Sequence, residues 1–196
     1  MNTVEFGSIE ASFHNARTVQ RLTLQDVILG DFPEPKELAN PNSLSKVYAQ
    51  ERKLREHPDR YAGAYIRNKL NAYIKTSEWS IADELPFAND QARMRLEELQ
   101  AEGVKLDPSR TLGIFGLVVS DKLPVEQQGE IASGLLDLAA DKGRLMSLQS
   151  IKIVLHDNDP VMSIARDHGY EFTGRVGEAA GASGLVQRLY RKPLDS

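Results

Sequence analysis

The chain has 196 residues, of which 41% are hydrophobic and 27% charged, a composition typical of one soluble globular domain. Its net charge of −4 and isoelectric point of 5.6 argue against nucleic acid as the main partner, because basic patches supply that affinity. It has no cysteine, which excludes disulfides, thiolate nucleophiles and cysteine-bound metals. No apolar run is long enough for a membrane span and the N-terminus lacks a signal-peptide pattern, so we expect a cytoplasmic protein with no membrane partner.

The first sixty residues give few patterns. Prolines and polar residues over 30–42 predict an irregular segment. Apolar residues at helical spacing between Leu44 and Leu54 predict a helix that ends at His57-Pro58. Two strands follow, Ala62–Ile66 and one from Ala72 to about Ile81, around a turn at Asn68-Lys69.

A helix is predicted over Asn89–Glu102, because apolar residues recur on one face and Gly103 suits a helix C-terminus. The residues expected to be buried on this face are Ala92, Leu96 and Leu99. The continuous apolar run Thr111–Val119 then predicts a central strand covered on both faces. Pro124 suits the first turn of a long helix that buries a stripe from Ile131 to Ala139, and Gly143 is the expected end of that helix.

The last third predicts a strand over Ile151–Leu155, a short helix capped by Asp159 and ended by Gly169, and two final strands, Phe172–Val176 and Leu185–Tyr190. Between these strands, glycines in the segment 177–184 could form an anion-binding nest, but a flexible hairpin loop is the favoured interpretation. The sum is an α/β sheet flanked by helices.

Two groups of side chains, one of histidines and aspartates and one of aromatic residues, could have either a functional or a structural role. His156, Asp157, Asp159 and His168 could suggest a metal site, but strand-end, helix-cap and packing roles account for them better, so we predict no metal. Trp79 and Phe87 are expected to pack in the core or a loop rather than to form a substrate cage.

The segment Ile151–Tyr170, with the residues that follow it up to Gly174, resembles the last third of the GNAT acyltransferase superfamily. In that family a strand ends in an asparagine that opens a helix, and the helix closes with Gly-Phe before the final two strands; Asn158 and Gly169-Tyr170 stand at that spacing. The resemblance extends over about 61–194, and it implies one GNAT-like domain over 1–196 with a mixed sheet flanked by helices. Residues 1–60 would supply its first strand and helices, and Asn89–Glu102 would be an extra helix between the third and fourth strands.

The resemblance also implies a binding site for acetyl-CoA as cosubstrate. Leu117, Val118 and Val119 would pair with the pantetheine arm as an added strand does, and an amide near Val118 would polarise the thioester carbonyl. The start of the following helix would hold the pyrophosphate through its free amide groups. The residues mapped there are Gln127, Gln128, Gly129, Glu130, Ile131, Ala132 and Ser133, with Asn158 beside the cofactor.

Two positions depart from the family pattern. Glu130 replaces a motif glycine, which puts a carboxylate beside the pyrophosphate, and Ala165 stands where many members have a tyrosine acid. Glu78 and Asp83 are candidates for a water-mediated base, with surface solvation as the alternative.

The resemblance therefore implies an N-acyltransferase that moves an acetyl group from acetyl-CoA to an amine, on a small molecule or a peptide, of unknown identity. The alternative is a catalytically degenerate GNAT-like domain that serves as a ligand-binding or protein-interaction module. Glu130 and Ala165 favour the alternative, whereas Asn158 and the order of elements favour the enzyme. Neither reading requires nucleic acid or a membrane, and both are compatible with a homodimer.

Overall fold

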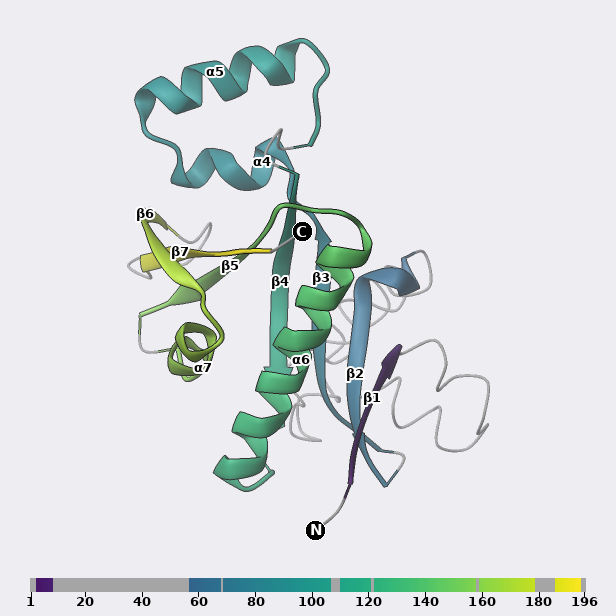
Figure 1. Ribbon diagram of the computed structural model, residues 1–196. Helices are drawn as coiled ribbons and strands as arrows, with labels where there is room; N and C mark the ends of the chain where they lie inside the picture. Colours follow the sequence, from purple (N-terminus) through teal and green to yellow (C-terminus); the bar gives the residue numbers. More distant parts are fainter. Residues whose placement is uncertain are drawn as a thin grey trace, which may run out of the picture. The chain divides into compact units, whose positions relative to one another are not determined.

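The computed structural model describes residues 3–8, 57–67, 69–106, 110–120, 122–157, 159–178 and 186–194. Its strands form one mixed seven-stranded sheet in the order β1-β2-β3-β4-β5-β7-β6, accompanied by helices (Figure 1), which confirms the predicted α/β class. The strands are β1 (Val4–Ser8), β2 (Tyr61–Ile66), β3 (Lys69–Glu78), β4 (Thr111–Val119), β5 (Ser150–His156), β6 (Glu171–Glu178) and β7 (Val186–Pro193). The described helices are η2 (Pro58–Arg60), α4 (Ile81–Glu84), η3 (Leu85–Phe87), α5 (Asp90–Ala101), α6 (Val125–Leu145) and α7 (Val161–Asp167).

None of the helices in the described ranges is both long enough and apolar enough to cross a membrane. The helix predicted between Leu44 and His57 lies largely outside the described residues, as does most of the segment 177–184. The fold divides into two compact units, Met1–Lys75 with Gly116–Leu138 and Thr76–Phe115 with Ala139–Ser196. They are described in turn.

The first unit contains the predicted hairpin of β2 and β3, with β1 antiparallel to β2. Arg67 in the hairpin turn has a φ of 51°, and its neighbour Asn68 lies outside the described residues. The N-terminal half of α6 packs against this unit through a position without a side chain. A Cβ on Gly134 would lie 2.3 Å from Cζ of Phe6, so glycine allows the ring from β1 to contact the helix. The buried apolar residues of this unit include Ala64, Leu70, Ala72, Ile74, Ile131, Leu135 and Leu136.

The second unit contains the parallel pair predicted from the sequence. Thr111–Ile114 of β4 pair with Ser150–Ile153 of β5, and β7 pairs antiparallel with both β5 and β6. The expectation that β4 is covered on both faces along its whole length is wrong. Thr111–Ile114 are buried, but Phe115 is exposed and the four residues that follow are only half-buried.

Gly143 does not end α6, since the helix continues to Leu145. A Cβ on Gly143 would lie 2.5 Å from Cδ1 of Leu194, near the chain's C-terminus. The glycine is therefore explained by a close tertiary contact, which sequence periodicity does not report.

The connection between β3 and β4 carries α4, η3 and α5 (Figure 1). β3 ends at Glu78 rather than near Ile81, because Ser80 caps α4: its hydroxyl accepts from the Asp83 amide, and the Asp83 carboxylate accepts from the Ser80 amide. α5 confirms the predicted inserted helix. Asn89 caps it by accepting from the amide of Ala92, and Gly103, with a φ of 86°, follows its last turn.

A polar cluster lies in the core of the second unit, around Glu84 of α4. Its Oε2 accepts from Nε1 of Trp79 at 2.8 Å and from Nζ of Lys152 at 2.7 Å. Its Oε1 accepts from the guanidinium of Arg175, whose side chain is 44% exposed, whereas those of Glu84 and Lys152 are 8% exposed. The Lys152 ammonium also lies 5.4 Å from the centroid of the Trp79 ring. Every charge in this cluster thus has an opposite charge, as burial requires.

Trp79 and Phe87 also pack with Leu189 in a buried apolar cluster, which confirms their predicted core role. A Cβ on Gly177 of β6 would lie 2.9 Å from Cε1 of Phe87, so this strand approaches η3 closely. The inserted helices are thereby anchored to β6 and β7 through η3.

Candidate functional site

The predicted cofactor residues of β4 and α6 all belong to the first unit, within one strand–turn–helix segment. We call residues 117–133 the cofactor segment. Leu117, Val118 and Val119 are the last three residues of β4 and are half-buried. Gln127 to Ser133 lie inside α6, which begins at Val125, two residues before the range mapped to the phosphates.

The turn between β4 and α6 is fixed by Ser120. Its amide donates to the carbonyl of Asn71 at 2.8 Å, so that the chain stays tied to β3 up to this residue. Its side chain is buried and accepts from the amide of Lys122, while its carbonyl accepts from the amide of Leu123. These bonds turn the chain directly into α6.

The free donors at the start of α6 follow from its first hydrogen bond. The amide of Gln128 donates to the carbonyl of Pro124 at 3.0 Å, which makes Pro124 the first carbonyl acceptor of the helix. The amides of Val125, Glu126 and Gln127 therefore precede the intrahelical ladder. Amides at this position, with the helix dipole behind them, can bind an anion such as a phosphate.

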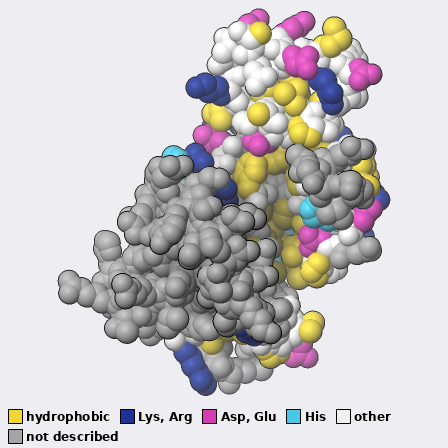
Figure 2. Space-filling model, turned by 180° about the vertical axis from the view of Figure 1, so that it is seen from behind, with side chains coloured by type: hydrophobic (Ala, Val, Ile, Leu, Met, Phe, Trp, Pro, Cys, Tyr) yellow, Lys and Arg dark blue, Asp and Glu magenta, His cyan; other side chains and the backbone are white. Residues whose placement is uncertain are grey.

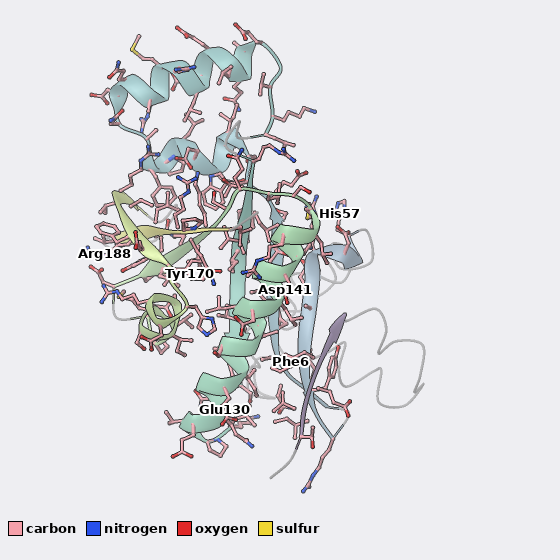
Figure 3. All side chains as sticks on the ribbon, viewed as in Figure 1. Phe6, His57, Glu130, Asp141, Tyr170 and Arg188 are labelled. Atoms are coloured by element: carbon pink, nitrogen blue, oxygen red, sulfur yellow. The ribbon has the colours of Figure 1, made fainter. Side chains whose placement is uncertain are left out.

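The charges around these amides are mixed. Lys122 in the turn is exposed and positive, whereas Glu126 and Glu130 are exposed and negative. Figure 3 shows Glu130 in the N-terminal part of α6. Because Glu130 stands five residues after Val125, at a rise of ~1.5 Å per residue its backbone lies ~8 Å along the helix from the first residue. Gln127, the last residue with a free amide, precedes Glu130 by three residues, ~4.5 Å along the helix, so Glu130 lies within one turn of these donors.

Gln128 has a structural role in the cofactor segment. Its Nε2 donates to the carbonyl of Leu123 at 2.7 Å, which ties the turn to the first turn of α6. Ile131 and Ala132 are buried, and Ser133 is half-buried. Within the range from Gln127 to Ser133, Glu130 is therefore the exposed side chain.

Asn158 lies outside the described residues, so its predicted place beside the cofactor stays a prediction. The helix that follows it is described. The prediction that Asp159 is the N-cap of this helix is wrong by one residue, since Pro160 is at the N-cap position. The Asp159 carboxylate still accepts from the amide of Val161, the first residue of α7. Gly169 has a φ of 80° just after the helix, as predicted for its end. Ala165 is fully buried and has no acidic proton to donate.

The two candidate bases differ in their surroundings. Asp83 is engaged in the capping box of α4, which accounts for its carboxylate. Glu78 is exposed at the end of β3.

Of the residues considered for a metal, Asp157 pairs with Arg188 of β7, and the Asp159 carboxylate accepts from the amide of Val161. Within the described part of the chain, no group of three or more histidine or acidic side chains could hold a metal ion.

Sequence reasoning missed the buried cluster of Glu84, Lys152 and Arg175. One signal was available, because Lys152 interrupts an apolar run that was expected to be a covered strand. A lysine in such a position requires a buried partner. The partner comes from a distant helix, so that the sequence gives no indication of Glu84.

Comparison with known proteins shows the fold but not a close relative. No family model matches this sequence, and no curated protein matches it either. Many solved structures match its fold. An acetyltransferase assigned to the GNAT family, from Desulfovibrio desulfuricans, aligns with a TM-score of 0.57 at 13% identity, over 98% of this chain and 100% of its own.

Two further structures were solved with a cofactor. The protein yncA from Salmonella typhimurium, assigned as an acetyltransferase and solved with acetyl-CoA, aligns with a TM-score of 0.56 at 10% identity, over 99% of this chain and 94% of its own. A chain of the NatC complex bound to Gag peptide and CoA aligns with a TM-score of 0.60 at 14% identity, over 100% of both chains. This chain therefore has the GNAT fold, as the sequence resemblance predicted.

Proposed function

We propose that this chain is an N-acyltransferase that uses acetyl-CoA as cosubstrate and an amine on a small molecule or peptide as acceptor. The observation that carries the proposal is the strand–turn–helix of the cofactor segment within a GNAT fold. It presents a strand end next to the free amides of a helix N-terminus. Structural neighbours with acetyl-CoA or CoA bound support the choice of cosubstrate.

The residues present fit such a molecule in part. The amides of Val125, Glu126 and Gln127 suit the pyrophosphate, and the exposed Lys122 adds a positive charge. The main chain of Leu117–Val119 would pair with the pantetheine arm, and the amide near Val118 would polarise the thioester carbonyl.

The reaction itself requires an unprotonated amine nitrogen that attacks the carbonyl carbon. A C–N bond forms, the C–S bond breaks, and the amine proton leaves to water or to the departing sulfur. Of the two predicted candidates for a water-mediated base, the Asp83 carboxylate is engaged in capping α4, and the role of Glu78 stays a prediction.

The experiment measures release of free CoA thiol with a thiol-reactive dye while a panel of amines is supplied with acetyl-CoA. Because the chain has no cysteine, the protein contributes no background thiol. We expect amine-dependent thiol release together with a rise in melting temperature on adding CoA, because a ligand bound only by the native state stabilises it. Absence of both the thermal shift and the thiol release would refute the proposal.

A second candidate function is a catalytically degenerate domain that binds an acyl-CoA or another ligand. It is favoured by Ala165, which is fully buried at the position where many family members have a tyrosine acid. Thermal stabilisation by CoA without thiol release, across the amine panel, would select this alternative.

Glu130 offers a test of where the pyrophosphate binds. Two unit charges ~8 Å apart interact by about 0.5 kcal/mol in water and about 2 kcal/mol at an effective dielectric constant near 20. Glu130 is exposed, so Glu130→Gln should tighten CoA binding by about threefold, measured by calorimetry. Glu97→Gln, at an exposed position of α5, is the matched control and should leave the affinity unchanged. Equal effects of the two substitutions would contradict phosphate binding at the start of α6.

A further inference from the structure

The second unit contains a pocket of about 790 Å³ beneath α5, within the range of about 300–1,000 Å³ usual for small-molecule sites. It is bounded by α4, α5, β5, β6 and β7, and no residue of the cofactor segment lines it. The lining residues are Glu84, Ala92, Arg95, Leu96, Leu99, Lys152, Glu171, Phe172, Thr173, Arg175, Leu189, Arg191 and Pro193.

One wall of the pocket is apolar. Ala92, Leu96 and Leu99 are the face of α5 that the sequence predicts to be buried, but no residue of this helix is buried in the structure. They are half-buried and face the pocket, across from Phe172 and Leu189 on the strands. Figure 2 shows hydrophobic side chains on the inner side of the α5 segment, with charged side chains toward its outer side. The apolar stripe of α5 is thus left for an occupant to cover.

The charges that line the pocket are in positive excess: four basic side chains stand against two acidic ones. Lys152 and Arg175 both pair with the single carboxylate of Glu84. The side chains of Arg95 and Arg191 make no hydrogen bond or ion pair with the rest of the described chain, although Glu171 lies opposite Arg191 in the strand register. Two guanidinium groups are therefore available at the rim of an apolar pocket.

We propose that this pocket binds a small molecule with a carboxylate on an apolar chain. The apolar chain would lie along the stripe of α5 and against Phe172, removing that surface from water. The carboxylate would accept charge-assisted hydrogen bonds from Arg95 and Arg191, since guanidinium groups match carboxylates in geometry. A cationic ligand would find less opposite charge, because Glu84 already accepts from Trp79, Lys152 and Arg175. The other lining carboxylate, Glu171, lies opposite Arg191 in the strand register.

The occupant can be detected through Trp79, the sole tryptophan of the chain. Its indole donates to Glu84, a lining residue, so a change in the pocket alters the field at the indole. Decanoate is the probe, decanol tests the need for the charge, and acetate tests the need for the chain. We expect saturable Trp79 fluorescence changes with decanoate at concentrations at least about tenfold lower than with either control.

Two variants place the site. Arg95→Ala and Arg191→Ala should each weaken decanoate binding by about fivefold or more, while Arg93→Ala, on the same helix but outside the pocket lining, should not. Circular dichroism of each variant confirms that the fold is retained.

Equal binding of decanoate and decanol, unchanged binding in both pocket variants, or no fluorescence response to decanoate would each overturn the proposal. These outcomes are independent of CoA binding and thiol release, so the proposed function is tested separately.

Discussion

The buried ion pair between Lys152 and Glu84 gives a stability prediction that depends on a contact between distant parts of the chain. The substitution is Lys152→Met, which keeps an unbranched side chain of similar length and removes the ammonium. It leaves the Glu84 carboxylate, 8% exposed, with the Trp79 N–H and the partly exposed Arg175 as its remaining donors.

The size of the loss in unfolding free energy depends on which hydrogen-bond donors and charges remain around Glu84. Removing one partner of a buried ion pair costs about 3–5 kcal/mol when the other charge is left uncompensated. Arg175 still compensates part of the charge on Glu84, which argues for the lower end. The contact of the ammonium with the Trp79 ring, at 5.4 Å, adds about 0.5–1 kcal/mol to the loss. We expect Lys152→Met to lower the free energy of unfolding by about 3.5–4 kcal/mol.

The assay is urea denaturation followed by the fluorescence of Trp79 and, independently, by circular dichroism. Agreement of the two transitions justifies a two-state analysis. Lys105→Met, at an exposed lysine, is the matched control and should change the unfolding free energy by less than about 0.5 kcal/mol. Glu84→Gln alone and Glu84→Gln together with Lys152→Met complete a double-mutant cycle, in which the doubly substituted protein lacks both charges of the pair. This doubly substituted protein should lose about 2 kcal/mol less than the sum of the single substitutions, because the two residues are in contact.

Two results would refute this reasoning. The first is a loss below about 1 kcal/mol for Lys152→Met, which would mean that the ammonium is not buried against the carboxylate. The second is additivity of the two substitutions, which would mean that the residues do not interact.

Of three further predictions, two concern glycines, and the third concerns an exposed ion pair. Gly113→Ala should lower the free energy of unfolding by about 2 kcal/mol, because a Cβ there would lie 2.6 Å from a ring atom of the buried Trp79. Gly129→Ala should raise it by about 0.5–1 kcal/mol, because this helix position has no neighbour within 4 Å; urea denaturation of both proteins checks the opposite signs. The hydrogen bond from Arg188, labelled in Figure 3, holds the pKa of Asp157 below its ordinary value of 3.8; desolvation opposes this effect in part, and the charge of Arg188 adds to the lowering. The contribution of this ion pair to folding stability is therefore present at a pH above that ordinary value and is lost as the pH falls through the lowered pKa of Asp157. Arg188→Gln should return the Asp157 pKa to its ordinary range in an NMR titration. An unchanged pKa would contradict the pairing.

The order of elements could be predicted from the sequence because its signals are local. The apolar run Thr111–Val119 defines β4 to the residue, since a strand requires only its own side chains to be suited to burial. Asn89 and Gly103 mark the ends of α5, because a cap acts within one turn of its own helix. The GNAT resemblance rested on such an ordered series, and the fold confirms it.

The cofactor segment was predicted in part. The strand end and the start of a helix at Pro124 follow from local pattern, but the amides that precede the intrahelical ladder are those of Val125 to Gln127. The family motif specifies only the spacing of residues along the chain, and this spacing does not determine at which residue helical hydrogen bonding begins. The mapped range therefore begins where the free amides end.

The features that only the tertiary structure determines are contacts between residues far apart in the sequence. Gly143 has the pattern of a helix end, but its role is set by Leu194, which packs against it. The stripe of α5 has the pattern of a buried face, yet burial depends on what stands opposite, and a pocket stands there. Lys152 is anomalous in its strand until Glu84 supplies the opposite charge. Periodicity and capping act within a few residues, whereas close packing, ion pairing and pockets depend on which elements the fold brings together.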